Sequence, residues 1–526
     1  MEMKYMKNLK YILSAFVLAI GFSSCVGDLN VDPIDPNIMT NSEAMATAQA
    51  FESTLAQLYA GFATSGYYGP NGDPSISGLD GGMSQYMRGL YHLNGLTTDE
   101  AVCGWNDQTI QDLHGMAWTT TDVFITAFFA RVFYQIALCN EYLRQAKAVT
   151  FDVPNLDVYC AEARTLRALC WYHAIDNFGN IPFSDENSVV GLEAPERKTR
   201  TEMFTWLESE LKDIIESSAI LPAKTNVYGR VDEVTAKMIL AKLYLNAEVY
   251  TGEEKYDECM EVCQDIATSG YALHTTVHGN GTNPYQELFL ADNNRCTDEI
   301  IFAIQQDGKE IQSYGVTNYL IFASTGGSMD AAAIGISSGW GGIRTTPEHY
   351  SKFLSGDLRD LFYKDGQEEE IKSVSNFKHG YAFMKFKNVN SDGTPGQAAG
   401  FVDTDWPIFR YADALLMIAE CAARGAEEGA VTGLAAFNEV HQRAGLGAVS
   451  SYTLDSILDE RACEFYQEGW RRSDLVRFGK FTSDSYLWAW KGGVKEGKGV
   501  SSHLNVFPIP EADIIANPNL RQNDGY

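Results

Sequence analysis

A helical period runs through most of the chain and limits the folds that it can adopt. In residues 231–247, apolar side chains recur with the i, i+3, i+4, i+7 spacing that places them on one face of a helix. A turn around residues 251–254 follows, and a second apolar stripe continues to Ile266. Two amphipathic helices joined by a short turn must bury their apolar faces against neighbouring elements. The first stripe comprises Ala236, Ile239, Leu240, Leu243 and Ala247.

Further helical stretches with similar lengths and spacings are predicted at residues 120–148, 157–178, 200–218 and 410–424. The pair of helices in residues 231–266 resembles one tetratricopeptide unit. Paired helices of this kind stack into a right-handed array. The sequence therefore predicts a mainly α fold, with a tetratricopeptide-like helical-repeat scaffold.

Two regions interrupt the helical pattern, at about residues 63–112 and 307–402. Both are rich in Gly and also contain Trp and Tyr. Long irregular segments inside a compact protein are usually functional or disordered, and disordered segments are poor in aromatic residues. We expect one body over residues 40–526, with its working surface in these two insertions.

The N-terminus has the pattern of a secretory signal. Lys4, Lys7 and Lys10 precede an apolar run over residues 11–22, which is too short for a stable membrane span. Cys25 follows small residues, as in bacterial lipoproteins, where this thiol is acylated, for instance with palmitate. We predict a signal peptide at 1–24, lipidation of Cys25 and a polar tether at 25–39. The alternative is an ordinary signal peptide with a coincidental cysteine.

Charge and cysteine usage exclude several classes of partner. The formal net charge of −29 disfavours nucleic acid and anionic lipid. Cys259 and Cys263 lie four residues apart, but no cluster of His or Cys accompanies them. The nine histidines show no ligand spacing. We therefore expect buried thiols, no metal ligands and no cofactor.

Several sequence blocks are similar to those of the SusD/RagB family. They occur in order along the mature chain, so the resemblance covers nearly all of it. The blocks are EARTLRA at 162–168, FGNIPF at 178–183, YGR at 228–230, NEV at 438–440, RAGL at 443–446, ERACEF at 460–465, RRSDLVRF at 471–478, FPIP at 507–510 and QNDGY at 522–526.

Three further stretches resemble the starch-binding members of that family: LTTDE at 96–100 with Trp105, QDG at 306–308 with Tyr314, and YLWAWKGG at 486–493. The resemblance implies that the protein has a SusD-like fold and that it lies on the outer membrane. It also implies a lid on a TonB-dependent transporter, to which the protein delivers α-glucan or malto-oligosaccharides.

The resemblance also implies a sugar site. The binding residues of the starch-binding members fall here on Asp80, Arg88, Trp105, Tyr314 and Trp340. An asparagine of that site appears as Gln108, and a second tryptophan appears as Cys103. These two departures leave room for a different glycan.

The residue types suit a sugar. Flat rings stack on the apolar C–H faces of a pyranose, and Trp105, Tyr314 and Trp340 would supply such platforms. Asp80 would accept and Arg88 donate charge-assisted hydrogen bonds to hydroxyl groups, while Gln108 can do both. The alternative interpretation is that the rings only fill gaps between insertion and scaffold, because Trp is usually largely buried. Weaker aromatic candidates are Tyr67, Tyr68, Tyr86, Trp118 and Trp406, of which we expect Trp118 and Trp406 to pack, and we expect the pair Trp488 and Trp490 to be structural.

The enzyme motifs are weak. Residues 335–339 fit G-x-S-x-G, but the flanking residues favour neither the preceding strand nor the following helix that a nucleophile elbow requires. The adjacent Asp99 and Glu100 do not indicate a glycosidase pair, which lies across a cleft. We predict a non-catalytic glycan-binding lipoprotein. The alternatives are the same role for another glycan, or an interaction scaffold without its own sugar site.

Overall fold

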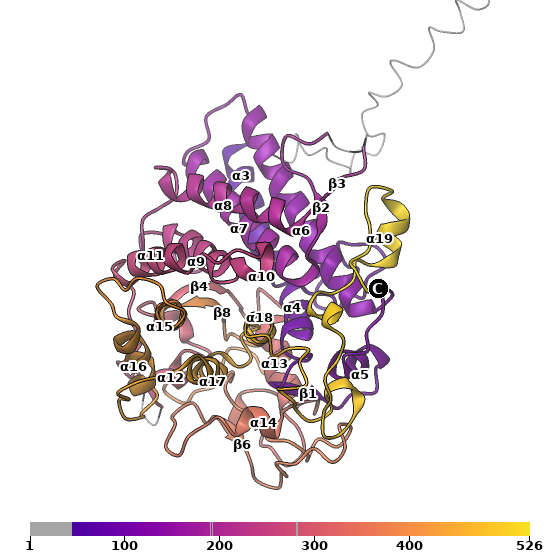
Figure 1. The fold of residues 1–526 in the computed structure, drawn as a ribbon. Helices are drawn as coiled ribbons and strands as arrows, with labels where there is room; N and C mark the ends of the chain where they lie inside the picture. Colours follow the sequence, from indigo (N-terminus) through magenta and orange to yellow (C-terminus); the bar gives the residue numbers. More distant parts are fainter. Residues whose placement is uncertain (1–44, 190, 192, 280–281) are drawn as a thin grey trace, which may run out of the picture.

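The computed structural model describes residues 45–189, 191, 193–279 and 282–526. The predicted signal peptide, Cys25 and tether lie outside these residues. Figure 1 shows a mainly helical body with a few short strands, which confirms the predicted fold class. Its longer helices are α3 (Ala48–Ala60), α4 (Tyr86–Asn94), α5 (Gln108–Gly115), α6 (Val123–Ala148), α7 (Leu156–Phe178), α8 (Arg200–Glu216), α9 (Glu233–Leu245), α11 (Tyr256–Ala267), α13 (Val316–Ser324), α15 (Tyr411–Ala423), α16 (Gly433–Arg443) and α17 (Leu454–Phe465).

Shorter helices and eight strands complete the described body. The shorter helices are α10 (Ala247–Thr251), α12 (Pro284–Glu287), α14 (Pro347–Tyr350), α18 (Arg471–Arg477) and α19 (Glu511–Ala516), with 3-10 turns η1 (Asn293–Arg295), η2 (Ala332–Ile334), η3 (Lys491–Gly493) and η4 (Ser502–Asn505). The strands are β1 (Ala101–Cys103), β2 (Ile181–Phe183), β3 (Glu196–Lys198), β4 (Ile300–Ile304), β5 (Ile343–Thr345), β6 (Phe362–Tyr363), β7 (Ala382–Phe383) and β8 (Trp406–Arg410).

The helices form a layered array in which neighbours pack in the order α6, α7, α8, α9, α11, α15 and α16. Local signals fix where they begin. The side chain of Asp122 caps α6, and α8 begins with a capping box between Thr199 and Glu202. The helical stretches predicted from the sequence are confirmed, including the turn between α9 and α11.

The second insertion is a closed excursion between two helices that pack together. Helix α11 ends at Ala267 and contacts α15, which begins at Tyr411. Antiparallel pairing of β4 with β8, from Ile300 opposite Arg410 to Ile304 opposite Trp406, closes the base of residues 307–402. Because the two ends of the excursion meet in this ladder, the helical array continues across it.

The first insertion is more regular than the sequence indicated. We expected little helical structure in residues 63–112, but α4 lies there with every residue buried, and α5 begins there at Gln108. The sequence shows no apolar stripe here because α4 is enclosed on all sides. Its buried surface includes polar residues such as Arg88 and His92, which interrupt the helical period.

A small sheet joins the two insertions. Its strand order is β1-β5-β7-β6, so one strand comes from the first insertion and three from the second. Ala101 lies opposite Thr345, and Cys103 lies opposite Ile343. The insertions therefore form one continuous structure beside the array, in the lower part of Figure 1.

Helix α6 lies at one end of the helical array and is largely buried. Among the described residues, it is the helix that is long and apolar enough to cross a membrane, but 61% of its most apolar window is buried inside the body. It packs against α4 and α7, and its Arg131 donates hydrogen bonds to the Ser65 and Ser84 carbonyl oxygens. These contacts are those of a core helix.

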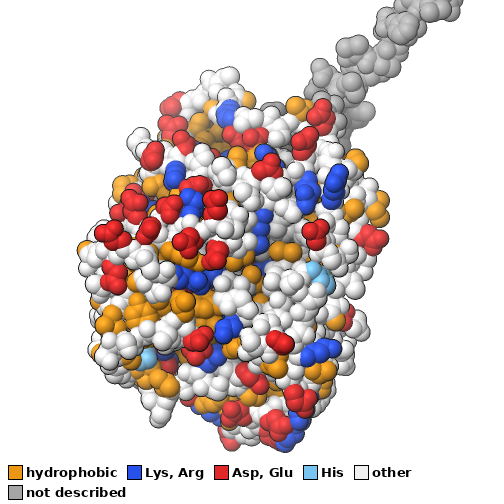
Figure 2. All heavy atoms as spheres, viewed as in Figure 1, with side chains coloured by type: hydrophobic (Ala, Val, Ile, Leu, Met, Phe, Trp, Pro, Cys, Tyr) orange, Lys and Arg blue, Asp and Glu red, His pale blue; other side chains and the backbone are white. Residues whose placement is uncertain are grey.

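Acidic side chains cover much of the outer face of the array. Figure 2 shows them gathered over the region of α9 and α11. On α11, Asp257, Glu261 and Asp265 are exposed, while Cys259 and Cys263 on the opposite side are fully buried. The negative net charge is therefore a property of the solvent face, and the two thiols are core side chains, as predicted.

Candidate functional site

Four half-buried aromatic rings form a continuous row where the two insertions meet. The ring centroids of Trp105 and Trp340 are 6.4 Å apart, those of Trp340 and Tyr314 are 6.0 Å apart, and those of Tyr314 and Phe401 are 5.4 Å apart. None of these planes is parallel to its neighbour; the angles are 50°, 67° and 37°. The row therefore presents its rings at different inclinations.

The sheet between the insertions positions the two tryptophans. Trp105 follows β1 and Trp340 precedes β5, and the Gly104 amide extends the ladder by donating to the Gly342 carbonyl oxygen at 2.9 Å. The indole nitrogen of Trp105 also donates to the Trp340 carbonyl oxygen at 3.3 Å. A pairing between distant strands thus brings together two residues that the sequence separates by 235 positions.

Tyr314 and Phe401 come from opposite ends of the second insertion. Tyr314 lies just before α13, and Phe401 lies near β8, where the excursion returns to its base. The sequence analysis did not single out Phe401. A lone phenylalanine after Gly400 carries no motif, and its place beside Tyr314 depends on the pairing of β4 with β8.

Arg88 has a positioning role in the structure. Its side chain is buried, and Nη1 donates to the carbonyl oxygens of Gly82 at 3.0 Å and Tyr314 at 3.3 Å. The guanidinium also lies 4.4 Å from the centre of the Tyr319 ring. Burial lowers the pKa of Arg88, although the charge of Asp80 opposes this shift. Arg88 therefore connects the first insertion to the backbone beneath the Tyr314 ring.

Asp80 and Gln108 are both exposed but have different surroundings. An Asp80 carboxylate oxygen accepts from the Gly82 amide at 2.8 Å. Gly82 is also the residue whose carbonyl oxygen accepts from Arg88. The Gln108 amide donates to Asp112 at 2.7 Å on the first turn of α5. Within the described ranges, neither hydrogen bonds nor ring contacts join Gln108 to the row of rings.

A cavity of about 280 Å³ lies on another side of Trp105. Trp490 and His114 are among its lining residues. The pair Trp488 and Trp490 was expected to be structural. Trp488 is fully buried, as expected, but Trp490 is half-buried and faces this cavity, so it belongs to the surroundings of the candidate site.

The remaining aromatic candidates divide by burial. Trp118 and Trp406 pack in the core, as predicted. Tyr86 is fully buried and contacts Phe62 and Phe128, so it cannot face a ligand. Tyr67 and Tyr68 are the most exposed of these rings, with 69% and 78% of their surface accessible.

The residues that suggested enzyme chemistry have structural roles. Asp99 is fully buried and forms an ion pair with Arg471 at 2.7 Å, and an oxygen of the buried Glu100 accepts from the Gln467 amide at 2.9 Å. At residues 335–339, Gly335 follows the 3-10 turn η2, and the next helix begins only at Pro347. The strand-turn-helix geometry of a nucleophile elbow is therefore missing here.

The chemistry available at the row is apolar stacking with a polar border. The rings carry electron-rich faces that attract the C–H groups of a pyranose, and their half-buried state leaves part of each ring available. The exposed Asp80 carboxylate can accept hydrogen bonds from hydroxyl groups, whereas the Gln108 amide pairs with Asp112 and has no contact with the row among the described residues. Such a surface is suited to stacking and hydrogen bonding with a sugar.

Comparisons with known proteins agree with this description. A profile described as "SusD family" matches residues 361–526. The starch-binding protein SusD of Bacteroides thetaiotaomicron is 34% identical over 580 aligned positions, which cover 100% of both chains. SusD-like protein P2 of Formosa agariphila is 22% identical, over 98% of this chain and 100% of its own.

Solved structures share the fold. Surface glycan-binding protein A from Bacteroides thetaiotaomicron, in complex with laminarihexaose, superposes with a TM-score of 0.70 at 20% identity, over 90% of this chain and 99% of its own. The corresponding protein from Bacteroides fluxus gives a TM-score of 0.70 at 20% identity, over 91% and 100%. The fold and the ring-bearing insertions define a helical-repeat protein of the SusD-like class. With full-length identity above 30% to one member, the chain belongs to the SusD family.

Proposed function

We propose that this protein captures glycan at the cell surface without cleaving it, and that the row Trp105, Trp340, Tyr314 and Phe401 is the binding platform. The observation that carries the proposal is the contiguity of these half-buried rings, with centroid spacings of 5.4–6.4 Å. The full-length similarity to a starch-binding protein supports it independently.

The proposed ligand class is a coiled α-1,4-glucan, such as starch or malto-oligosaccharide. A helical glucan presents successive sugar faces at changing angles, and the planes of the four rings also change direction along the row. Stacked sites of this kind are individually weak, so strong retention of polymer would come from many anchored copies. Through the family, we also propose a lipid anchor at Cys25 and delivery to a TonB-dependent transporter.

Affinity electrophoresis of the purified body tests the binding proposal. We expect amylopectin in the gel to retard the wild-type protein, and laminarin, a β-1,3-glucan, to retard it less. Trp105→Ala and Trp340→Ala should each abolish most of the retardation, because each removes a stacking face. Trp206→Ala is the matched control, since this half-buried ring contacts Trp171 and Phe183 on the scaffold.

Retardation by laminarin but not by amylopectin would show that the ligand is not an α-glucan. It would still support the row of rings as the binding platform. If none of a broad panel of glycans retarded the wild-type protein, the interaction-scaffold alternative would be favoured instead. The delivery proposal has a separate test, which is co-purification of the full-length protein with a TonB-dependent transporter from detergent-solubilised outer membranes. Cys25→Ser should release the protein from that membrane fraction.

A further inference from the structure

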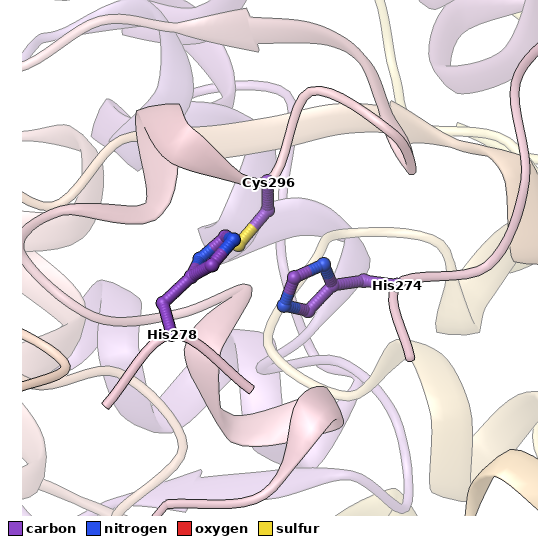
Figure 3. A group of neighbouring side chains, drawn as sticks. All are labelled: His274, His278 and Cys296. Atoms are coloured by element: carbon purple, nitrogen blue, oxygen red, sulfur yellow. The ribbon is translucent and has the colours of Figure 1, made fainter. Parts of the chain in front are cut away.

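Three side chains with metal-binding atoms converge outside the row of rings. The donor atoms of His274, His278 and Cys296 all lie within 4.8 Å of one another. Figure 3 shows the Cys296 sulfur beside the His278 imidazole, with the His274 ring facing them from the other side. Sequence spacing gave no sign of this group, because the fold brings Cys296 next to residues that precede it by about 20 positions.

The site is built mainly from buried groups. His274 and Cys296 are almost fully buried, and His278 reaches the solvent. Both carboxylate oxygens of Asp298 lie 2.9–3.0 Å from Nδ1 of His274. A carboxylate at Nδ1 would hold the proton there and leave Nε2 to coordinate once an ion replaces the Glu287 contact at that nitrogen. This is the arrangement that supports most metal-bound histidines.

Glu287 supplies an oxygen next to both imidazoles. Its Oε1 accepts from the Gly279 amide and the Thr282 hydroxyl, at 2.9 Å and 2.7 Å. Its Oε2 lies 3.2 Å from Nε2 of His274 and 3.5 Å from Nδ1 of His278. This second oxygen also accepts from the His278 backbone amide at 2.8 Å, and its remaining lone pair would supply a fourth ligand to an ion held by the two histidines.

The local charge favours a cation. Asp298 and Glu287 place carboxylate oxygens at the two ring nitrogens of His274, at 2.9 Å and 3.2 Å. The same carboxylates create a negative field, which a divalent ion would compensate on displacing the thiol proton.

We propose that His274, His278 and Cys296 bind a divalent transition-metal ion of the Zn²⁺ class. A tetrahedral zinc site with nitrogen and sulfur donors has ligand-to-ligand edges of roughly 3.3–3.8 Å, so shifts of about 1 Å would complete the geometry. Imidazole and thiolate ligands select zinc-like ions over Ca²⁺ or Mg²⁺, which prefer oxygen. The ion would fasten residues 274–278 to the end of η1, just before β4 at the base of the second insertion.

Cobalt substitution provides a direct test on the purified protein, with no glycan in the assay. We expect one equivalent of Co²⁺ to give a thiolate-to-metal charge-transfer absorption band that Zn²⁺ displaces. Cys296→Ser should remove the band, and His278→Ala should weaken binding roughly tenfold or more. Cys160→Ser is the matched control, because this half-buried cysteine on α7 lies outside the group.

Zinc should also raise the unfolding temperature of the wild type and of Cys160→Ser, but not that of His278→Ala. His278 is exposed, so its replacement should leave the metal-free unfolding temperature unchanged and exclude misfolding as the cause. The proposal is overturned if wild-type protein shows no charge-transfer band, or if the band persists in Cys296→Ser. Either result leaves the glycan-binding proposal untouched.

Discussion

The indole of Trp105 lies directly over the backbone of Gly342. A Cβ atom at Gly342 would come within 2.6 Å of Cε2 of Trp105, a distance that requires one of the two groups to move. The φ angle of Gly342 is outside the left-handed region, so an alanine there is free of backbone strain. Gly342 therefore controls where the Trp105 ring lies.

Gly342→Ala should displace the Trp105 ring while retaining every aromatic residue. We expect glycan affinity to fall by roughly tenfold, about 1.4 kcal/mol, because a tilted ring loses stacking contact. Isothermal titration with a malto-oligosaccharide measures the change. Gly447→Ala is the control, since its Cβ would meet no atom within 4 Å and it lies on the scaffold after α16. Equal affinities of Gly342→Ala and wild type would contradict a stacking role for Trp105.

Phe401 extends the platform beyond the three rings that the sequence indicated. We expect Phe401→Ala to weaken binding of long oligosaccharides more than that of short ones, because Phe401 lies at the end of the row, beside Tyr314. Isothermal titration with malto-oligosaccharides of increasing length measures this difference in affinity. Tyr68→Ala removes a more exposed aromatic ring and should change the affinity for neither long nor short oligosaccharides. A uniform loss at all lengths would place Phe401 at the centre of the site.

Arg88 and Gln108 were both predicted as polar contacts to the sugar, but their surroundings predict different phenotypes. Arg88→Met removes buried charge-assisted hydrogen bonds to Gly82 and Tyr314, so we expect a loss of about 2 kcal/mol in the free energy of unfolding. Gln108→Ala should leave stability unchanged within about 0.5 kcal/mol, since the side chain is exposed. Urea unfolding measures both. A stable Arg88→Met protein with reduced glycan affinity would instead favour direct sugar contact by Arg88.

The scaffold was predictable from the sequence because its signals are local. The apolar stripes of α9 and α11 lie on consecutive turns, and a capping box between Asp232 and Thr235 sets the start of α9. The blocks that resemble the family have a structural explanation as well. Arg461 pairs with Asp413 at 2.8 Å and with Asp474 at 2.9 Å, and both partners lie in the core. Buried ion pairs tolerate little change, since loss of one partner leaves an uncompensated charge.

The site was only partly predictable because long-range pairing creates it. Trp105 and Trp340 were identified through the family resemblance, but their contact depends on the register of β1 against β5. Strands of three residues leave almost no periodic signal. Phe401 and the group around Cys296 were missed for the same reason. Their neighbours are supplied by the fold, and the surrounding sequence does not indicate them.

Glu100 is a buried acid whose ionisation opposes folding. Burial raises its pKa from 4.5 to about 7, although a hydrogen bond from the Gln467 amide to its carboxylate acts in the other direction. Between pH 4.5 and 7 the folded chain therefore keeps a proton on Glu100 that the unfolded chain has released. The contribution of Glu100 to the free energy of unfolding therefore falls as pH rises through this interval, because the unfolded state binds fewer protons at this group.

Replacement of Glu100 by glutamine removes this titration while keeping an oxygen to accept from the Gln467 amide. The free energy of unfolding of Glu100→Gln relative to wild type should increase by up to about 3 kcal/mol between pH 4.5 and 7, and level off above pH 7. Urea unfolding at closely spaced pH values measures this difference, in which the titration of other groups cancels. The exposed Glu254→Gln is the control and should give a flat difference. A flat difference for Glu100→Gln too would mean that Glu100 is ionised in the folded protein throughout this range, with its charge compensated inside the core.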